Sequence, residues 1–431
     1  MIKVALLGCG TVGSGVIKLL ADNKHVIARR AGHEVQVTKI MESDPEKVRA
    51  LGLDDGIIAA SIDEILNDDD CQIVIELIGG IEPAKTYIIE AMKKGKNVVT
   101  ANKDLIASHG KELFEAAEEN SVDFNFEASV GGGIPIIFPL KLSLAGNRIQ
   151  EVIGILNGTT NYILTKMSGE KEPYEKVLQE AQQLGYAESD PTSDVEGYDA
   201  ARKIAILASI AFNSRVSFED VYVEGITRLT PLDIKYGQEL GFVIKLLAIT
   251  KEEEDKIQVR VHPAFIPRTH PLAVVGGVYN AVFVRGDAVQ DLMFYGRGAG
   301  QMPTASAVVG DIMEIVRDIE KNNTGRISCT CYLNKEIAAI SKLKAKYYVR
   351  LLAKDRPGVL AGIAGVFGNH EVSLATVLQK DSNQGYAQLV LITDLVEESD
   401  LRSALKVLSE MDIVGAVENV IRLEGVSGHE S

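Results

Sequence analysis

The sequence predicts an α/β protein that begins with a doubly wound parallel sheet and ends in a small β-rich unit. Residues 1–130 alternate short apolar runs with helical periods, which is typical of parallel strands joined by crossover helices. Residues 131–300 mix helical periods with short strands and indicate an α+β domain. Residues 347–425 follow the order βαββαβ, the ferredoxin-like arrangement. With 431 residues, the chain is also too long for one ordinary domain.

The strands of the first domain are expected to be short and apolar, because parallel strands are covered on both faces. One helix begins near Gly13, and another runs from Leu105 to Glu119. Residues from about 300 to 325 return to helical spacing, and we expect them to complete this domain. The strands are expected at Val4 to Leu7, Val35 to Met41, Ile73 to Ile75, Val98 to Val99 and Val122 to Phe126.

The first strand is followed by a glycine loop, Gly8-Cys9-Gly10-Thr11-Val12-Gly13, which matches G-x-G-x-x-G. The pattern is weak alone, but its place between a strand and a helix is that of dinucleotide-binding, Rossmann-type domains. Gly8 allows the tight turn, Gly10 lets a pyrophosphate approach, and Gly13 allows close packing of helix on strand. The backbone N–H groups of Thr11 and Val12 at the helix N-terminus are expected to bind the phosphates.

The end of the second strand selects between NAD and NADP. An acidic residue there binds the ribose 2′-hydroxyl, whereas a basic residue accommodates a 2′-phosphate. Glu42-Ser43-Asp44 occupies this position and favours NAD, although Lys39 and Lys47 are close. We therefore expect NAD or NADP as the cofactor, with a slight preference for NAD.

The most informative segment runs from Ala181 to Lys203. A solvated loop would explain its charges but not the glycines and proline between them, and a metal site usually alternates its ligands more densely. A third interpretation is a site for a cationic substrate, in which carboxylates hold an ammonium while Lys203 faces a reacting oxygen. The carboxylates are Glu188, Asp190, Asp194, Glu196 and Asp199, and the last shares a helix face with Lys203.

This segment resembles the signature of the homoserine dehydrogenase family, A-x(3)-G-Y-A-x(2)-D-P-x(2)-D-V-x-G-x-D-x(3)-K. Members of that family interconvert L-homoserine and L-aspartate 4-semialdehyde with a nicotinamide cofactor, in the synthesis of threonine, methionine and isoleucine. The resemblance therefore implies an oxidoreductase. It extends to further blocks at Thr100 to Asp104, Phe126 to Pro135, Asn157 to Tyr162 and Gly298 to Gly300.

The resemblance also implies roles for single residues. Lys203 is the favoured acid or base at the reacting oxygen, and Lys103 lies beside the nicotinamide and the substrate. Reduction of an aldehyde by hydride builds negative charge on its oxygen, which an ammonium can stabilise and then protonate. Without the resemblance, Lys203 could be half of a plain helix ion pair and Lys103 a surface charge. The implied substrate ligands are Glu188, Asp194 and Asp199, and the implied cofactor ligands include Thr100, Lys103 and Gly300.

The family also holds a monovalent cation, usually sodium, through a glutamate and neighbouring backbone carbonyls. Such an ion would pin the hinge between the cofactor and substrate regions, and the alternative is a glycine-rich turn without an ion. Many members that prefer NADP carry Arg or Lys where this chain has Ser43, which again favours NAD. The matching cation positions are Glu127, Val130, Gly132 and Ile134.

The C-terminal unit resembles an ACT domain in its loop Asp355-Arg356-Pro357-Gly358-Val359-Leu360. Such domains often bind an amino acid through this loop, whose backbone meets a carboxylate at a helix N-terminus. The effector implied by the family is threonine, bound by Asp355, Gly358 and Val359, and the alternative is an oligomerisation module without a ligand.

We expect residues 131–300 to serve substrate binding and dimerisation and residues 326–346 to be a connector.

The balance of 45 basic against 60 acidic residues gives a net charge of −15, which disfavours binding to nucleic acid or anionic membranes. No apolar run approaches the roughly 18–20 residues that span a bilayer. Four scattered cysteines do not form a disulfide framework. We therefore expect a cytoplasmic protein, and the family resemblance implies a homodimer or homotetramer. A catalytically silent amino-acid sensor and another NAD(P)-dependent dehydrogenase are the alternative functions.

Overall fold

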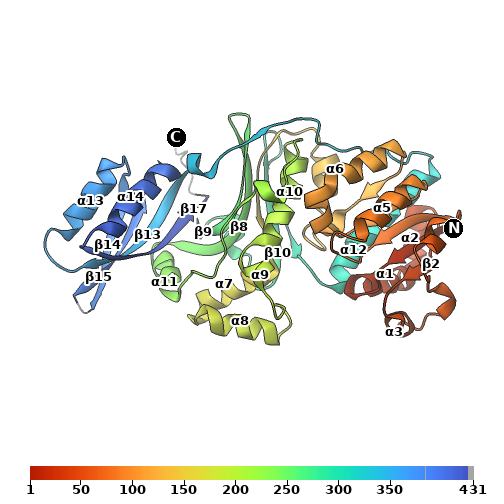
Figure 1. Cartoon of the computed structure of the whole chain (residues 1–431), viewed down its shortest axis with the longest axis horizontal. Helices are drawn as coiled ribbons and strands as arrows, with labels where there is room; N and C mark the ends of the chain where they lie inside the picture. The colour runs from red at the N-terminus through yellow and green to blue at the C-terminus, as the bar shows by residue number, and fades with distance from the viewer. Residues whose placement is uncertain (384, 426–431) are drawn as a thin grey trace. The chain divides into compact units, whose positions relative to one another are not determined.

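The chain forms two compact units in a computed structural model that describes residues 1–383 and 385–425 (Figure 1). Both units are assembled from segments far apart in the sequence, and the expected domain 131–300 is divided between them. The first unit contains Met1–Leu156, Ala201–Val221 and Tyr279–Lys335, and the second contains Asn157–Ala200, Tyr222–Val278 and the chain from Glu336 onward.

The first unit is built on a five-stranded parallel sheet in the order β2-β1-β3-β4-β5, which confirms the Rossmann-type α/β fold. The connections change direction between β1 and β3, and ligands of such sheets bind at the carboxyl ends of the strands beside this point. The last strand is shorter than expected. The strands are β1 (Ile2–Leu7), β2 (Val35–Met41), β3 (Cys71–Glu76), β4 (Asn97–Thr100) and β5 (Phe124–Asn125).

Helix α12 (Gln301–Glu320) packs against α1 (Thr11–Asp22), and Figure 1 shows the two side by side. A Cβ added at Gly15 would lie 2.8 Å from the side chain of Gln301, so a small residue allows this contact. The apolar face of α12 joins the same core as β1. The other helices are α2 (Lys24–Ala31), α3 (Pro45–Arg49), α4 (Asp63–Leu66), α5 (Ala84–Lys93), α6 (Lys103–Glu119) and α10 (Tyr198–Ala211), the last entering this unit at Ala201.

The first unit also contains three antiparallel strands, with β10 (Tyr279–Gly286) between β6 (Ile149–Ile155) and β11 (Gln290–Arg297). The loop that follows β6 leads into the second unit at Asn157, and the chain that follows β11 leads to α12.

A long hairpin of β8 (Phe242–Glu253) and β9 (Lys256–Pro267) forms the centre of the second unit, where we had expected short strands. Its turn residues, Glu254 and Asp255, have φ values of 51° and 61°. These are the left-handed values that a two-residue hairpin turn needs, and the usual sequence for them is Asn-Gly or Asp-Gly. The absence of that signal explains why the hairpin was not predicted.

The C-terminal part of the second unit has the expected βαββαβ order, with its strands in the sheet order β17-β13-β15-β14. Both of its helices pack on one face of the sheet, in a single apolar core. Strand β17 also pairs in parallel with β9, which joins this sheet to the hairpin. The elements are β13 (Lys344–Lys354), α13 (Val359–Asn369), β14 (Leu374–Asn383), β15 (Tyr386–Thr393), α14 (Glu398–Glu410) and β17 (Val414–Leu423).

The expected connector is partly ordered strand. Residues up to Lys335 belong to the first unit, whereas β12 (Glu336–Ile337) pairs with β9 and β13 already begins at Lys344. Among the residues in the described ranges, no helix is long and apolar enough to cross a membrane. The remaining elements are α7 (Gly158–Glu170), α8 (Tyr174–Gln183), α9 (Thr192–Val195), α11 (Pro231–Glu239), β7 (Tyr222–Val223) and β16 (Val396–Glu397).

Candidate active site

The glycine loop joins β1 to α1. Gly8 has a φ of 93°, and a Cβ there would lie 2.7 Å from the carbonyl oxygen of Leu77. A Cβ at Gly13 would lie 2.3 Å from the carbonyl oxygen of Gly8, so this packing requires glycine. No atom lies within 4 Å of a Cβ placed at Gly10, and no side chain caps α1. The loop therefore has room for a phosphate group, and the first N–H groups of α1, at Thr11 and Val12, are suitable donors.

Glu42, directly after β2, faces the glycine loop. Its carboxylate accepts hydrogen bonds from the N–H groups of Cys9 (2.6 Å) and Asp44 (3.1 Å) and from the Ser43 hydroxyl (3.1 Å). Burial raises the pKa of Glu42, but these bonds and the ammonium of Lys47 outweigh burial and lower the pKa. An ionised carboxylate therefore stands at the strand end where the ribose of a dinucleotide binds in this fold.

A buried carboxylate that sequence reasoning missed orders the loops after β3 and β4. Glu76 accepts hydrogen bonds from the N–H groups of Ile78 (2.8 Å) and Gly79 (3.0 Å) and from the Thr100 hydroxyl (2.6 Å). Thr100 in turn accepts a bond from the N–H of Asn102 (3.0 Å). The expected cofactor residue Thr100 thus holds two loops together. The only signal in the sequence was an acidic residue at the end of an apolar strand.

Lys103 is the first residue of α6, at the carboxyl end of β4. The Asn102 side chain caps the helix, since its Oδ1 accepts from the N–H of Leu105 (3.1 Å) and its Nδ2 donates to the Gly80 carbonyl (2.7 Å). A cation at a helix N-terminus is disfavoured by the helix dipole. The position of Lys103 therefore does not stabilise the helix, and it lies at the sheet edge that binds ligands in this fold.

The Glu127 carboxylate fixes the turn that follows β5. It accepts hydrogen bonds from the N–H groups of Ile136 (2.5 Å), Ile137 (2.8 Å) and Phe138 (2.7 Å). Burial raises the pKa of Glu127, and the three hydrogen bonds oppose this effect. These donors occupy three of the roughly four acceptor positions of the carboxylate, and the backbone carbonyls of the turn are ligands of the type that hard cations prefer. Within the part of the chain described, no three His, Cys, Asp or Glu side chains form a metal-binding group.

The same turn contacts the glycine block that follows β11. Gly132 has a φ of 56°, and a Cβ there would lie 2.5 Å from the carbonyl oxygen of Gly298. Gly300 directly precedes α12. The structure therefore brings together, within the first unit, the expected cation turn and the expected cofactor residue Gly300.

The amide of Asn157 holds two of the expected substrate ligands. Its Nδ2 donates to a carboxylate oxygen of Asp194 (2.7 Å) and to one of Asp199 (2.9 Å). Its Oδ1 accepts from the N–H of Thr160 (2.8 Å), which caps α7. Asp199 is 6% exposed. The helix cap therefore fixes the orientation of the amide, and the amide fixes both carboxylates. Sequence reasoning had placed Asn157 in a family block without giving it a role.

The other carboxylates of the acidic segment have different surroundings. Asp190 accepts bonds from the hydroxyl and N–H of Thr192, and these bonds lower the pKa of Asp190. Glu196 accepts a bond from the Thr227 hydroxyl (3.2 Å). Glu188, the third expected substrate ligand, is exposed, and its backbone carbonyl accepts from Gln182 (3.0 Å). Within the second unit, Asp199 is thus buried, Asp194 and Glu196 are partly buried, and Glu188 and Asp190 are exposed.

Lys203 lies on α10, one helical turn after Asp199. Its ammonium donates to the carbonyl oxygen of Leu156 at 2.8 Å. Leu156 and Asn157 are consecutive residues after β6, and they contact Lys203 and Asp199 respectively. The ammonium is therefore held by a neutral backbone acceptor.

The loop between β13 and α13 lines a pocket that includes the expected effector residues Asp355, Gly358 and Val359. Gly358 has a φ of 86° and precedes α13, which no side chain caps. The Gln379 amide on β14 donates to a carboxylate oxygen of Asp355 (3.1 Å), and Arg356 also lines the pocket. The pocket therefore presents a helix N-terminus, an acid and a base within a few residues.

Three family models match this chain. The NAD-binding domain of homoserine dehydrogenase matches residues 8–127, homoserine dehydrogenase matches residues 135–313, and the ACT domain matches residues 347–412. Together with the glycine loop and the parallel sheet, these matches define an NAD(P)-dependent oxidoreductase that carries an ACT domain. A homoserine dehydrogenase from Synechocystis is 46% identical, over 98% of this chain and 99% of its own length. The chain belongs to the homoserine dehydrogenase family.

Solved structures agree. A homoserine dehydrogenase from Thiobacillus denitrificans has a TM-score of 0.93 and 41% identity and covers 98% of both chains. A hyperthermophilic archaeal homoserine dehydrogenase in complex with NADPH has a TM-score of 0.62 and 27% identity, and it covers 73% of this chain and 97% of its own. The Thiobacillus denitrificans protein therefore shares this fold over 98% of the chain, and the archaeal protein shares it over 73% of the chain.

Proposed function

We propose that this homoserine dehydrogenase binds the ammonium of L-aspartate 4-semialdehyde with Asp194 and Asp199 and exchanges the reaction's proton through Lys203. The observation that carries the proposal is the Asn157 amide, which holds Asp194 together with Asp199, and Asp199 lies one helical turn before Lys203.

The two carboxylates suit a cationic group. An amide donates hydrogen bonds without neutralising a carboxylate, so Asp194 and Asp199 each keep their own charge when ionised. Two neighbouring negative charges repel one another, and an ammonium offsets that repulsion. Glu188, which is exposed, is proposed as a third ligand of the amino and hydroxyl end of the substrate.

Lys203 is proposed to hold and move the proton. The reduced nicotinamide, when bound, supplies a hydride to the aldehyde carbon. Negative charge then develops on the aldehyde oxygen, where the ammonium of Lys203 stabilises it and gives up a proton to form the hydroxyl. In the reverse direction the neutral amine of Lys203 takes the hydroxyl proton. Lys103, at the sheet edge, is proposed to lie beside the nicotinamide and the substrate.

NAD is the proposed preferred cofactor. Gly8 and Gly13 allow the close packing of the loop, Gly10 leaves space before α1, and Glu42 supplies a carboxylate at the end of β2. Ser43 brings no positive charge for a 2′-phosphate. The archaeal relative was solved with NADPH, so kinetics with both cofactors must decide between them.

A sodium ion is proposed to bind the turn after β5 through the backbone carbonyls of Glu127, Val130, Gly132 and Ile134. The Glu127 carboxylate supports that site because it accepts hydrogen bonds from three backbone N–H groups of the segment that follows the turn. Replacing sodium with choline in the buffer is expected to lower the melting temperature, and no change would contradict the proposal.

Threonine is proposed to bind the pocket at the N-terminus of α13, with its carboxylate at the N–H groups after Gly358 and its ammonium at Asp355. Threonine titration should inhibit wild type, and Asp355→Asn should weaken inhibition at least about tenfold while kcat stays unchanged. Equal inhibition of both proteins would exclude this pocket. A homodimer or homotetramer and a cytoplasmic location remain predictions.

The reaction itself is tested by following NADH and NADPH oxidation with L-aspartate 4-semialdehyde. Succinate semialdehyde is the matched control substrate, because it keeps the aldehyde and carboxylate but lacks the ammonium. Loss of a charged hydrogen bond costs about 1.5–3 kcal/mol, so kcat/KM should fall roughly 10- to 150-fold. Equal use of the two aldehydes would refute ammonium recognition by the acidic segment.

A further inference from the structure

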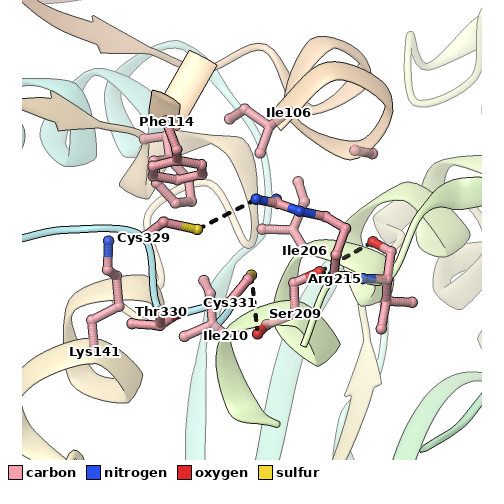
Figure 2. A pocket seen from close by; sticks show the side chains of 13 residues that line it. Ile106, Phe114, Lys141, Ile206, Ser209, Ile210, Arg215, Cys329, Thr330 and Cys331 are labelled. Carbon is pink, nitrogen blue, oxygen red and sulfur yellow. Dashed lines mark hydrogen bonds between the residues drawn. The ribbon is translucent and has the colours of Figure 1, made fainter. Parts of the chain in front are cut away.

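A second reactive site is suggested by a pocket in the first unit, apart from the glycine loop (Figure 2). Its walls come from α6, from α10 beyond Lys203, and from residues 329–331. Phe114 and the aliphatic residues make most of it apolar, whereas Lys141 and Arg215 bring two cationic groups. Two cysteines, Cys329 and Cys331, complete the lining.

The cationic groups face the sulfur of Cys329. The Nη2 of Arg215 donates a hydrogen bond to Cys329 Sγ at 3.3 Å, which Figure 2 marks with a dashed line. The ammonium of Lys141 lies 5.4 Å from the centre of the Phe114 ring, in the same pocket. Burial lowers the pKa of Lys141, and the charge of Cys329 acts in the opposite sense. A thiolate at Cys329 is therefore surrounded by groups that stabilise negative charge.

The two sulfurs also interact with each other. A hydrogen bond from Cys331 lowers the pKa of Cys329 to about 6, with Arg215 and Lys141 acting in the same direction and burial opposing them. The same hydrogen bond raises the pKa of Cys331. Cys331 Sγ also lies 3.7 Å from the carbonyl oxygen of Ser209. The contacts therefore favour a thiolate at Cys329, which accepts a hydrogen bond from Arg215, and a thiol at Cys331, which donates to the Ser209 carbonyl.

The other two cysteines are different. Cys9 and Cys71 are buried, and burial raises the pKa of each. Cys329 and Cys331 are only partly buried, so a small reagent can reach them. The backbone beside them is anchored, because the N–H of Cys329 donates to Glu118 (2.9 Å) and that of Leu333 donates to the Asn213 carbonyl (2.8 Å).

We propose that Cys329 and Cys331 form a dithiol site that reacts with hydroperoxides, with Cys329 as the attacking sulfur and Cys331 as the resolving sulfur. The Cys329 thiolate attacks the terminal peroxide oxygen, the O–O bond breaks, and the leaving alkoxide or hydroxide takes a proton. Cys329 is now a sulfenic acid, oxidised by two electrons. The Cys331 sulfur then attacks the Cys329 sulfur, a disulfide forms, and water leaves with the Cys331 proton. A thiol reductant then reduces the disulfide to the two cysteine thiols and is itself oxidised to a disulfide.

The test treats the full-length wild-type protein with hydrogen peroxide and maps its cysteine peptides by mass spectrometry. We expect the peptide with both cysteines to lose two hydrogen atoms and to regain them with dithiothreitol, while Cys9 and Cys71 stay reduced. In Cys331→Ser, dimedone should trap the sulfenic acid at Cys329, and Cys71→Ser should behave as wild type. Peroxide that leaves the pair reduced, or that oxidises Cys329 without forming the disulfide in wild type, would overturn the proposal.

Alkylation of wild type by iodoacetamide across pH gives a readout that needs no variant. Cys329 should react with a midpoint near pH 6, as its lowered pKa implies, against about 8.5 for an ordinary thiol. The charged groups that act on this sulfur are Arg215, Lys141 and Cys331, and Asp311 and Glu118 act on Lys141. A midpoint of 8 or above would overturn the assignment of Cys329 as the attacking sulfur.

Discussion

Asn157 shows at the residue scale how one neutral side chain prepares a charged site. It caps α7 with its oxygen and bridges Asp194 and Asp199 with its nitrogen. The acidic residues were predictable from the sequence because they lie in one segment. The bridge was not, because Asn157 is 37 and 42 residues away from its two partners and only the folded chain brings them together.

Asp199→Asn tests this pair most sharply. The substitution keeps the shape and removes one charge, so kcat/KM for L-aspartate 4-semialdehyde should fall about 10- to 100-fold, mainly through KM. Cofactor affinity, measured by fluorescence titration, should not change. Glu175→Gln, at an exposed position of α8, is the matched control and should keep wild-type kinetics. A variant with unchanged KM would contradict ammonium binding at Asp199.

At the scale of elements, predictability depended on whether the signal was local. The β1 strand, the glycine loop and α1 were predicted because the turn and the helix start are encoded in six consecutive residues. The β8–β9 hairpin was missed because Glu254 and Asp255 adopt left-handed conformations, which the residue types Glu and Asp in this order do not predict. Lys103 was expected either beside the nicotinamide and the substrate or as a surface charge. Its place at the start of α6 depends on the helix cap formed by Asn102.

The end of β2 gives a prediction at this scale. Ser43→Arg places a positive charge where a 2′-phosphate binds, so the ratio of kcat/KM for NADPH to that for NADH should rise at least about tenfold. Both cofactors are measured on the same enzyme, and NADH serves as the internal control. An unchanged ratio would mean that the β2 end does not contact the ribose.

At the scale of the molecule, each unit combines segments from distant parts of the chain. The domains expected from the sequence were continuous segments, so their boundaries differ from those of the two units. In the second unit the last strand, β17, lies against β9 and is fastened by the pair between Arg260 and Glu424 (2.8 Å). A chain cut near residue 340 would therefore lose a partner strand of β9 as well as the ACT domain. Point substitutions in the effector pocket are the better probe of regulation.

The Arg260–Glu424 pair predicts how stability depends on pH. Burial raises the pKa of Glu424, but Arg260 and His262 outweigh burial and lower it below the usual range. A carboxylate whose pKa is lower in the folded than in the unfolded protein stabilises the fold when it is ionised. This stabilisation is present above the pKa of the group in the unfolded chain, about 4.3, and is lost as the pH falls below that value. Glu424→Gln should therefore lower the free energy of unfolding by about 2 kcal/mol at pH 7 and by less at pH 4.

Urea unfolding at both pH values measures this difference. Glu410→Gln, at the exposed end of α14, is the matched control and should change stability by less than about 0.5 kcal/mol. The pH assignment would fail if Glu424→Gln destabilised the protein equally at pH 4 and pH 7.

Turnover by Lys203→Met tests most directly whether Lys203 exchanges the proton with the substrate. The variant removes the ammonium that binds the Leu156 carbonyl and leaves the glycine loop intact. We predict that kcat falls by about 10²- to 10⁴-fold, the range for a group that transfers a proton, and that cofactor affinity is unchanged. Lys176→Met, an exposed lysine on α8, should retain full activity. Near-normal turnover by Lys203→Met would show that Lys203 does not exchange the proton with the substrate.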